Sequence, residues 1–323
     1  VSEPPKTSTW LHEVTHQLFY ELGAQVKDVA AGQNIWAIEG VAMYMESFRE
    51  HGHFVTVGGF ESYRLQFARY RKTVDQFYLP LQQLTALGNS QLSSHVEIRR
   101  LYSQCVGLAH FLMDADNGKY RDPFFQLLRK IYTNTSTAGT LRQLSGRSFE
   151  ELDAAYAKFL VVTDAHLGSL RPETKLKALC LAHGQITNQG LQHLSGQGEL
   201  NWLDLTRCEI TDDSSKVLVG LVNLNQLSLE STKITDKSMA VIGALPNLEE
   251  LDLSLTQVGD AGVLHLKGNN NLTVLWLTGT KVSDDSEPVL ITLANLELLE
   301  LTSTAMSAST IQQVFSVLPK LKP

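Results

Sequence analysis

Leucine residues recur every 24 residues throughout the second half of the chain. They form Leu-x-Leu pairs at Leu179/Leu181, Leu203/Leu205, Leu227/Leu229, Leu251/Leu253, Leu275/Leu277 and Leu299/Leu301. Two further apolar columns keep the same phase, one from Leu200 to Leu296 and one from Ile186 to Met306. The alternation in each pair predicts a short strand with one buried face. Since one turn cannot bury its own leucines, we predict a stacked solenoid, with parallel strands on the concave face and short helices outside.

Polar residues mark the turns of this repeat. Aspartates precede the helical stretch of four turns, and we predict that they are helix N-caps: Asp212, Asp236, Asp260 and Asp284. The whole pattern resembles the leucine-rich repeat family, L-x-x-L-x-L-x-x-N/C-x-L, over about residues 175–321. It departs in the column that usually holds Asn or Cys, which is here Gly184, Cys208, Thr232, Thr256, Thr280 and Thr304. A threonine hydroxyl can still bond backbone groups there, so we predict six 24-residue repeats.

Several side chains that flank the buried leucines are predicted to face solvent on the concave side: Trp202, Asp204, Glu230, Glu250, Asp252, Trp276 and Glu300. Tryptophan is enriched where proteins bind one another, and acidic neighbours would add charge to such a strip. The resemblance to leucine-rich repeats implies a protein or peptide partner on this face. The alternative is a face that is merely solvated.

The first half of the chain reads as helices. Apolar periodicity predicts them at about residues 60–75, 94–115, 120–132 and 149–163. The last begins with a capping box formed by Ser148 and Glu151. We therefore predict a mixed α and α/β fold, with a mainly helical domain at 1–168 and the solenoid at 169–323, joined around residues 164–173.

The segment near the start of the chain, residues 10–19, contains an HExxH motif. Its histidines, His12 and His16, are four residues apart, so a helix places both imidazoles on one face where they can share a metal ion. Zinc suits such nitrogen ligands. Glu13 lies beside this pair and can take a proton from water that the metal activates. The alternative is an amphipathic helix whose histidines are simply polar.

A second motif follows the first after about twenty residues. The segment from Trp36 to Glu46, WAIEGVAMYME, predicts a helix with a carboxylate, Glu39, near its start. A third ligand from this helix would complete a set of two histidines and one glutamate and leave one position for water.

Together the two motifs resemble gluzincin metallopeptidases, and among these the peptidase MA-like domains of bacterial proteins. The resemblance implies a zincin-like fold with zinc held by His12, His16 and Glu39, with Glu13 as general base. It also implies that Glu46 orients a ligand imidazole. By the same resemblance Tyr102 would hold the oxyanion, although a tyrosine that packs between helices is an equal alternative. The pair His51 and His53 is more typical of surface histidines.

The chain departs from this family in two places. A proline usually stands two residues before the tryptophan of the second motif, where this chain has Asn34. Gluzincins also have a β-sheet before the HExxH helix, whose edge binds substrate, whereas eleven residues precede His12 here. Two functions therefore stay open: a zinc metallopeptidase with repeats that recognise a protein, or a non-catalytic binding protein with a structural or vestigial zinc site.

Composition narrows the class of protein. Of 323 residues 43% are hydrophobic and 19% charged, which is ordinary for a folded protein, and the net charge of −7 disfavours nucleic acid as a partner. Three cysteines are too few for a disulfide framework, and no apolar run is long enough to span a membrane. The chain starts at Val1 without methionine, so we expect a fragment. Family resemblance implies an exported bacterial protein.

Overall fold

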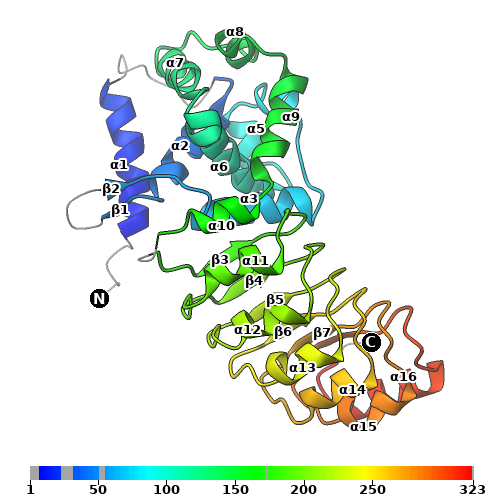
Figure 1. Ribbon diagram of the computed structural model, residues 1–323. Coiled ribbons are helices and arrows are strands. Elements are labelled where there is room, and N and C mark those ends of the chain that lie inside the picture. The colour runs from blue at the N-terminus through cyan, green and yellow to red at the C-terminus, as the bar shows by residue number, and fades with distance from the viewer. Residues whose placement is uncertain (1–6, 23–31, 51–54, 172–173, 322–323) are drawn as a thin grey trace, which may run out of the picture. The chain divides into compact units, whose positions relative to one another are not determined.

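The computed structural model describes residues 7–22, 32–50, 55–171 and 174–321. The chain forms two compact units, Val1–Leu160 and Val161–Pro323 (Figure 1). The first contains the helices α1 (Thr7–Leu22), α2 (Ile35–Met45), α3 (Tyr63–Thr73), α4 (Leu81–Leu84), α5 (Asn89–Ser93), α6 (Ile98–Asp114), α7 (Arg121–Tyr132), α8 (Thr140–Ser145) and α9 (Phe149–Leu160), a 3₁₀ turn η2 (Ala115–Asn117), and a two-stranded antiparallel ribbon of β1 (Arg49–Glu50) and β2 (Val55–Thr56). The prediction of a helical first half is confirmed, and the ribbon is an addition to it.

Helix α2 lies in the centre of the helical unit. Nine of its eleven residues are buried, and it packs mainly against α6 and α1. Trp36 is fully buried and stacks on Phe124 of α7 at 6.2 Å between ring centroids. At Gly40 a Cβ atom would lie 2.6 Å from the carbonyl oxygen of Cys105, so α2 and α6 cross in close backbone contact. The glycine therefore lets the helix that carries Glu39 sit deep in the unit.

The departure at Asn34 has a backbone explanation. Asn34 is the N-cap of α2 and has φ of 66°, in the left-handed region. Proline fixes φ near −65° and lacks an N–H, whereas the Asn34 N–H donates to Thr85 O at 3.1 Å. The Asn34 side chain also donates to Thr137 O at 2.9 Å. In this chain α2 therefore begins with a turn that proline does not adopt.

The second unit is a six-stranded parallel sheet with its strands in sequence order. Its elements are α10 (Asp164–Gly168), β3 (Ala178–Cys180), α11 (Asn188–Leu191), η3 (Gln192–Leu194), β4 (Trp202–Asp204), η4 (Asp212–Ser214), α12 (Ser215–Leu218), β5 (Gln226–Ser228), α13 (Asp236–Ile242), β6 (Glu250–Asp252), α14 (Asp260–Val263), η5 (Leu264–Leu266), β7 (Val274–Trp276), η6 (Asp284–Ser286), α15 (Glu287–Leu290), β8 (Leu298–Glu300) and α16 (Ala308–Val317). Each strand pairs with the next in the predicted register, Leu179 with Leu203 and so on to Leu299. The repeat prediction is confirmed.

The threonine column bonds backbone as predicted. Each hydroxyl donates to the carbonyl oxygen three residues earlier, from Thr232 at 2.6 Å to Thr304 at 2.8 Å. Cys208 instead lies 3.2 Å from Leu181 O. At Gly184 a Cβ atom would lie 2.6 Å from that same Leu181 oxygen, so the first turn of this column has room only for glycine.

The predicted role of the aspartate column was wrong. The N-caps are the residues just before it, and the hydroxyls of Thr211, Thr235 and Ser283 accept from amides of their own helices. The aspartates reach into the next turn instead: Asp212 accepts from Thr235 N at 2.9 Å and from Thr235 Oγ1 at 2.7 Å. Asp260 bonds Ser283 in the same way. The column therefore ties consecutive repeats together.

The same kind of contact shows that the repeat unit begins before the predicted boundary at residue 168. Asp164, in α10, accepts from Thr187 N at 2.9 Å and from Thr187 Oγ1 at 2.7 Å, and Thr163 forms a parallel bridge to Gln185. These are the contacts that later turns make with one another. Residues 161–168 therefore belong to the repeat unit, where they act as a partial first turn.

Replacing Asp212 by alanine is expected to destabilise the repeat unit by about 1–3 kcal/mol, because Thr235 and the buried Ser238 lose a hydrogen-bond acceptor. Burial alone would raise the Asp212 pKa, but bonds from Ser238 and Thr235 hold that pKa below its usual value. A lowered folded-state pKa stabilises the fold above the unfolded pKa of about 3.9, and this stabilisation is lost as pH falls through the folded value. Urea unfolding at neutral pH and near pH 2 measures both effects, with exposed Asp213→Ala as control; equal stability of both variants at neutral pH would contradict the tie.

Candidate metal centre

Three side chains from two helices converge in the helical unit. His12 and His16 lie one turn apart on α1, and their Nε2 atoms are 3.1 Å apart. Glu39 comes from the adjacent α2, with its two carboxylate oxygens 3.8 Å from His12 Nε2 and 3.9 Å from His16 Nε2. One donor atom from each of the three lies within 4.8 Å of the others. All three side chains are half-buried, so solvent reaches the cluster.

Glu46 fixes the orientation of His12. The Nδ1 atom of His12 donates to Glu46 Oε1 at 3.0 Å, which leaves the lone pair of Nε2 facing His16 and Glu39. The Glu46 side chain is only 8% exposed. Its carboxylate forms an ion pair with Arg64 of α3, whose Nε and Nη2 atoms lie 2.9 Å and 2.8 Å from Oε2. The predicted role of Glu46 fits this geometry. Arg64 completes the arrangement and was not predicted.

The charges around the histidines differ in their effects. The hydrogen bond to Glu46 raises the pKa of His12 against the opposing effect of burial, and nearby Glu39 and Glu13 add to the rise. Burial lowers the pKa of His16, and the neighbouring His12 lowers it further. The two Nε2 atoms face each other at 3.1 Å with carboxylates nearby, so this position stabilises a positive charge, whether a proton or a metal ion.

The donor set fits zinc. Four donors around a tetrahedral zinc ion at about 2.0 Å lie roughly 3.3 Å from one another. The two Nε2 atoms are 3.1 Å apart, and one donor atom from each of His12, His16 and Glu39 lies within 4.8 Å of the others, so a small movement of the Glu39 carboxylate would bring the three to this spacing. Two imidazoles and one carboxylate leave the fourth position free, as catalytic zinc sites require.

Two further predicted residues lie beside the cluster. Glu13 is exposed, and its charge acts on both histidines. Tyr102 of α6 is half-buried, and burial together with the charge of Glu39 raises the pKa of its phenol. The phenol therefore keeps its proton near neutral pH and is available as a hydrogen-bond donor. The pair His51 and His53 lies outside the described residues.

Six of the seven residues predicted to bind a partner fall into two columns of the repeat sheet, and the seventh, Glu230, follows the end of β5. Trp202 is in register with Glu250, whereas Asp204, Asp252, Trp276 and Glu300 share the other column. Six of the seven, including Glu230, are partly exposed. Asp204 is the exception and the prediction that it faces solvent was wrong: it is 1% exposed and accepts from Thr206 N at 2.9 Å. Burial raises the pKa values of Asp204, Asp252 and Glu230.

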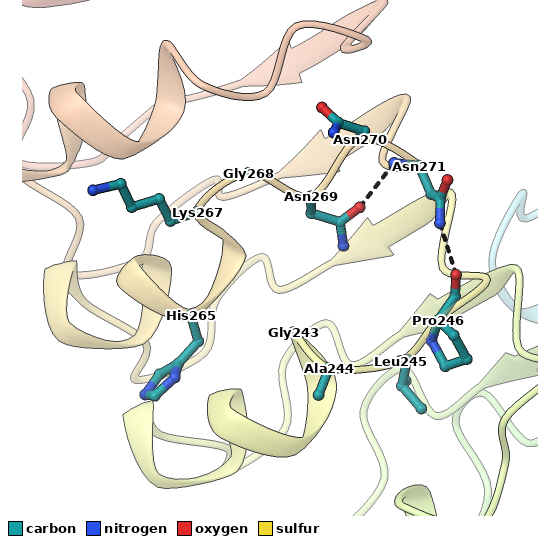
Figure 2. A pocket seen from close by; sticks show the side chains of 10 residues that line it. All are labelled: Gly243, Ala244, Leu245, Pro246, His265, Lys267, Gly268, Asn269, Asn270 and Asn271. Atoms are coloured by element: carbon teal, nitrogen blue, oxygen red, sulfur yellow. Dashed lines mark hydrogen bonds between the residues drawn. The ribbon is translucent and has the colours of Figure 1, made fainter.

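A hollow of about 400 Å³ lies in the repeat unit, between the loops that follow α13 and η5 (Figure 2). Its polar side chains serve the repeat itself. Asn271 donates to Pro246 O at 2.7 Å, and Asn269 accepts from Asn271 N at 2.9 Å. Asn247 and Asn295 make the corresponding bond in neighbouring turns. The hollow therefore results from asparagine side chains that bond each turn to the one before it. Its described residues form no group of catalytic or metal-binding side chains.

A pocket of about 230 Å³ includes Arg64, which pairs with Glu46, and Tyr102, which senses the charge of Glu39; the sequence analysis did not predict it. Helices α2, α3 and α6 line it with Met43, Arg64, Phe67, Arg71, Arg99, Tyr102, Ser103 and Val106. A signal was present: Arg64, Phe67 and Arg71 are spaced by three and four residues, which places them on one helical face. What the sequence does not contain is the pairing of that face with α6.

Among the residues that the structure describes, no helix is long and apolar enough to cross a membrane.

The family described as "Leucine rich repeat" matches residues 198–258, and the "Protein of unknown function (DUF1570)" family matches residues 6–137. A search of curated proteins finds no match. Similar solved structures include two internalins of Listeria monocytogenes. InlF is 20% identical, with 46% of each chain covered and a TM-score of 0.36. Internalin C2 is 24% identical, covering 50% of this chain and 72% of that one, with a TM-score of 0.36.

A third is leiomodin-1 actin-binding site 2, 15% identical, covering 49% of this chain and 86% of that one at a TM-score of 0.32. The chain spans about half the length of the first of these structures. The 24-residue register of the sheet and the family match together identify the second half of the chain as a leucine-rich repeat region, which indicates protein binding. It follows a helical region that matches a family of unknown function.

Proposed function

We propose that the helical unit is a zinc-dependent peptidase and that the repeat unit recognises the protein it acts on. The observation that carries the proposal is the convergence of His12, His16 and Glu39 with a free fourth position and with Glu13 beside it. A site that only stabilises the fold would favour four protein ligands and has no use for an adjacent base.

Each residue has a distinct part in this proposal. His12, His16 and Glu39 would hold the ion, and Glu46 would keep His12 in the tautomer that presents Nε2. Zinc, when bound, supplies a Lewis acid that acidifies water and polarises a carbonyl. Glu13 accepts the proton of the attacking water and passes it to the leaving amine. Tyr102 donates from its phenol to the oxygen on which negative charge develops.

The metal content of the purified chain tests the site. About one zinc per chain is expected in the wild type, with most of it lost in His16→Ala and in Glu39→Ala, because each substitution removes one of three ligands. Glu21→Ala is the matched control, since Glu21 is an exposed glutamate on the same helix and bonds only Gln17 among the described side chains. Wild-type protein that takes up no zinc, or a Glu39→Ala variant that keeps it, contradicts the proposal.

Hydrolysis then separates the two functions that the sequence leaves open. Zinc-loaded protein is incubated with a mixture of unstructured peptides, and new amino termini are counted with and without a chelator. Cleavage that the chelator stops supports the peptidase. Stoichiometric zinc without any cleavage assigns the ion a structural role and leaves protein binding by the repeats as the function.

A further inference from the structure

We propose that the arginine pocket beside the metal cluster binds a carboxylate of the substrate, so that the preferred peptide carries this group next to the bond that is cleaved. The arginine pocket is the hollow lined by Arg64, Arg71 and Arg99 with Met43, Phe67, Tyr102, Ser103 and Val106. The proposal rests on the proposed peptidase function and adds a substrate class to it.

Charge sets this pocket apart from the rest of the molecule. None of the eight lining residues is acidic, in a chain whose net charge is −7. Glu46 pairs with Arg64, and Asp75 pairs with Arg71. Arg99 has no ion-pair partner within the described part of the chain, and it is exposed. The neighbouring Arg100 pairs with Glu97 at 3.3 Å and shares Asp75 at 3.9 Å, so Arg99 carries the positive charge of the pocket that no described carboxylate pairs with. A guanidinium binds a carboxylate through two parallel hydrogen bonds.

The pocket adjoins the candidate site through three residues. Met43 is one turn after Glu39 on the same face of α2. Arg64 holds Glu46, which in turn holds His12. Tyr102 lines the pocket and also senses the charge of Glu39. The pocket and the candidate site therefore share residues. A peptide with a carboxylate bound at Arg99 would extend from there towards the cluster, where its scissile carbonyl would lie.

Size and lining define what fits. A volume of about 230 Å³ is below the roughly 300–1,000 Å³ of pockets that hold drug-sized ligands, so a single side chain or a chain end suits it better than a folded segment. Met43, Phe67 and Val106 give an apolar wall for a short aliphatic stem. A charged head on such a stem is found in an aspartate or glutamate side chain and in the carboxyl-terminal residue of a peptide.

Binding to chelator-treated protein tests the pocket without depending on catalysis. Three short peptides of one sequence are titrated by calorimetry: one with a free carboxyl terminus and neutral side chains, one amidated with a single glutamate, and one amidated with glutamine in its place. At least one carboxylate peptide is expected to bind about tenfold more tightly than the amidated glutamine peptide, and this preference weakens at high salt. The arm that binds identifies the source, a chain end or an acidic side chain.

Substitutions assign the effect to the pocket. Arg99→Ala is expected to remove the preference, Arg99→Lys to keep part of it, and Arg99→Glu to reverse it towards a lysine peptide. Arg129→Ala is the matched control, an exposed helical arginine of α7 outside the pocket. Equal affinity for all three peptides, no measurable binding of any, or an equal loss in Arg129→Ala overturns the proposal. If the preference is found but zinc-loaded protein cleaves nothing, the pocket stands and the proposed peptidase function fails.

Discussion

Replacing Glu13 by glutamine is expected to lower peptide hydrolysis by about 10²- to 10⁴-fold while the zinc content stays at the wild-type level. Glu13 contributes no donor atom to the cluster of His12, His16 and Glu39, so the ion keeps its three ligands. Its carboxylate is exposed, and its charge acts on both histidines. Glutamine has the same shape and cannot accept the proton.

The measurement is kcat/KM for a peptide cleaved by the zinc-loaded wild type, with metal analysis on the same samples. Glu21→Gln is the control, because it makes the same chemical change two turns further along α1 and away from the cluster. Activity retained by Glu13→Gln would show that this carboxylate is not the base. Zinc lost from Glu13→Gln would show instead that the side chain supports the ligands.

The architecture of the repeat unit could be predicted because three apolar columns stay in phase over six turns and stacking is the only way to bury them. The aspartate column shows where such prediction ends. Thr211 and Asp212 are both good N-cap residues, so spacing along one turn does not tell them apart. The choice is made by Thr235 in the next turn, whose amide and hydroxyl lie within reach of the Asp212 carboxylate.

Asp204 illustrates a second limit. Alternation along a strand correctly places Leu203 in the core and Asp204 on the other face. It says nothing of how closely neighbouring columns cover that face. Asp204 is buried because its carboxylate turns back onto Thr206 and lies 3.9 Å from Cys180 Sγ of the adjacent strand.

The candidate metal centre also contains residues that the sequence predicts and one that it does not. Local spacing on one helix gives His12 and His16, and a family resemblance adds Glu39 and Glu46. Arg64 follows from neither, because it joins the site only where α3 meets the end of α2. Residues on separate helices with no shared motif come together through packing, and one sequence alone does not record that packing.

Replacing Gly40 by alanine is expected to lower both stability and zinc affinity. In an isolated helix this change would stabilise by about 1 kcal/mol, because alanine is the better helix former. Here the new Cβ atom would lie 2.6 Å from Cys105 O and 3.3 Å from Ala109 Cβ, so α2 and α6 must separate. Such overpacking costs about 1–3 kcal/mol. Glu39 precedes Gly40 directly, so the same movement displaces its carboxylate relative to the histidines of α1.

Urea unfolding and a chelator competition for zinc measure the two effects. Gly139→Ala is the control, since a Cβ atom there meets nothing closer than 4.0 Å and its φ of −82° suits alanine. If Gly40→Ala loses stability but binds zinc normally, α2 shifts without rotating Glu39 out of place. If it is as stable as the wild type, α6 yields at Cys105 and the close crossing does not position the ligand. Loss of both, with Gly139→Ala unchanged, shows that the close crossing of α2 and α6 at Gly40 positions Glu39 in the candidate metal site.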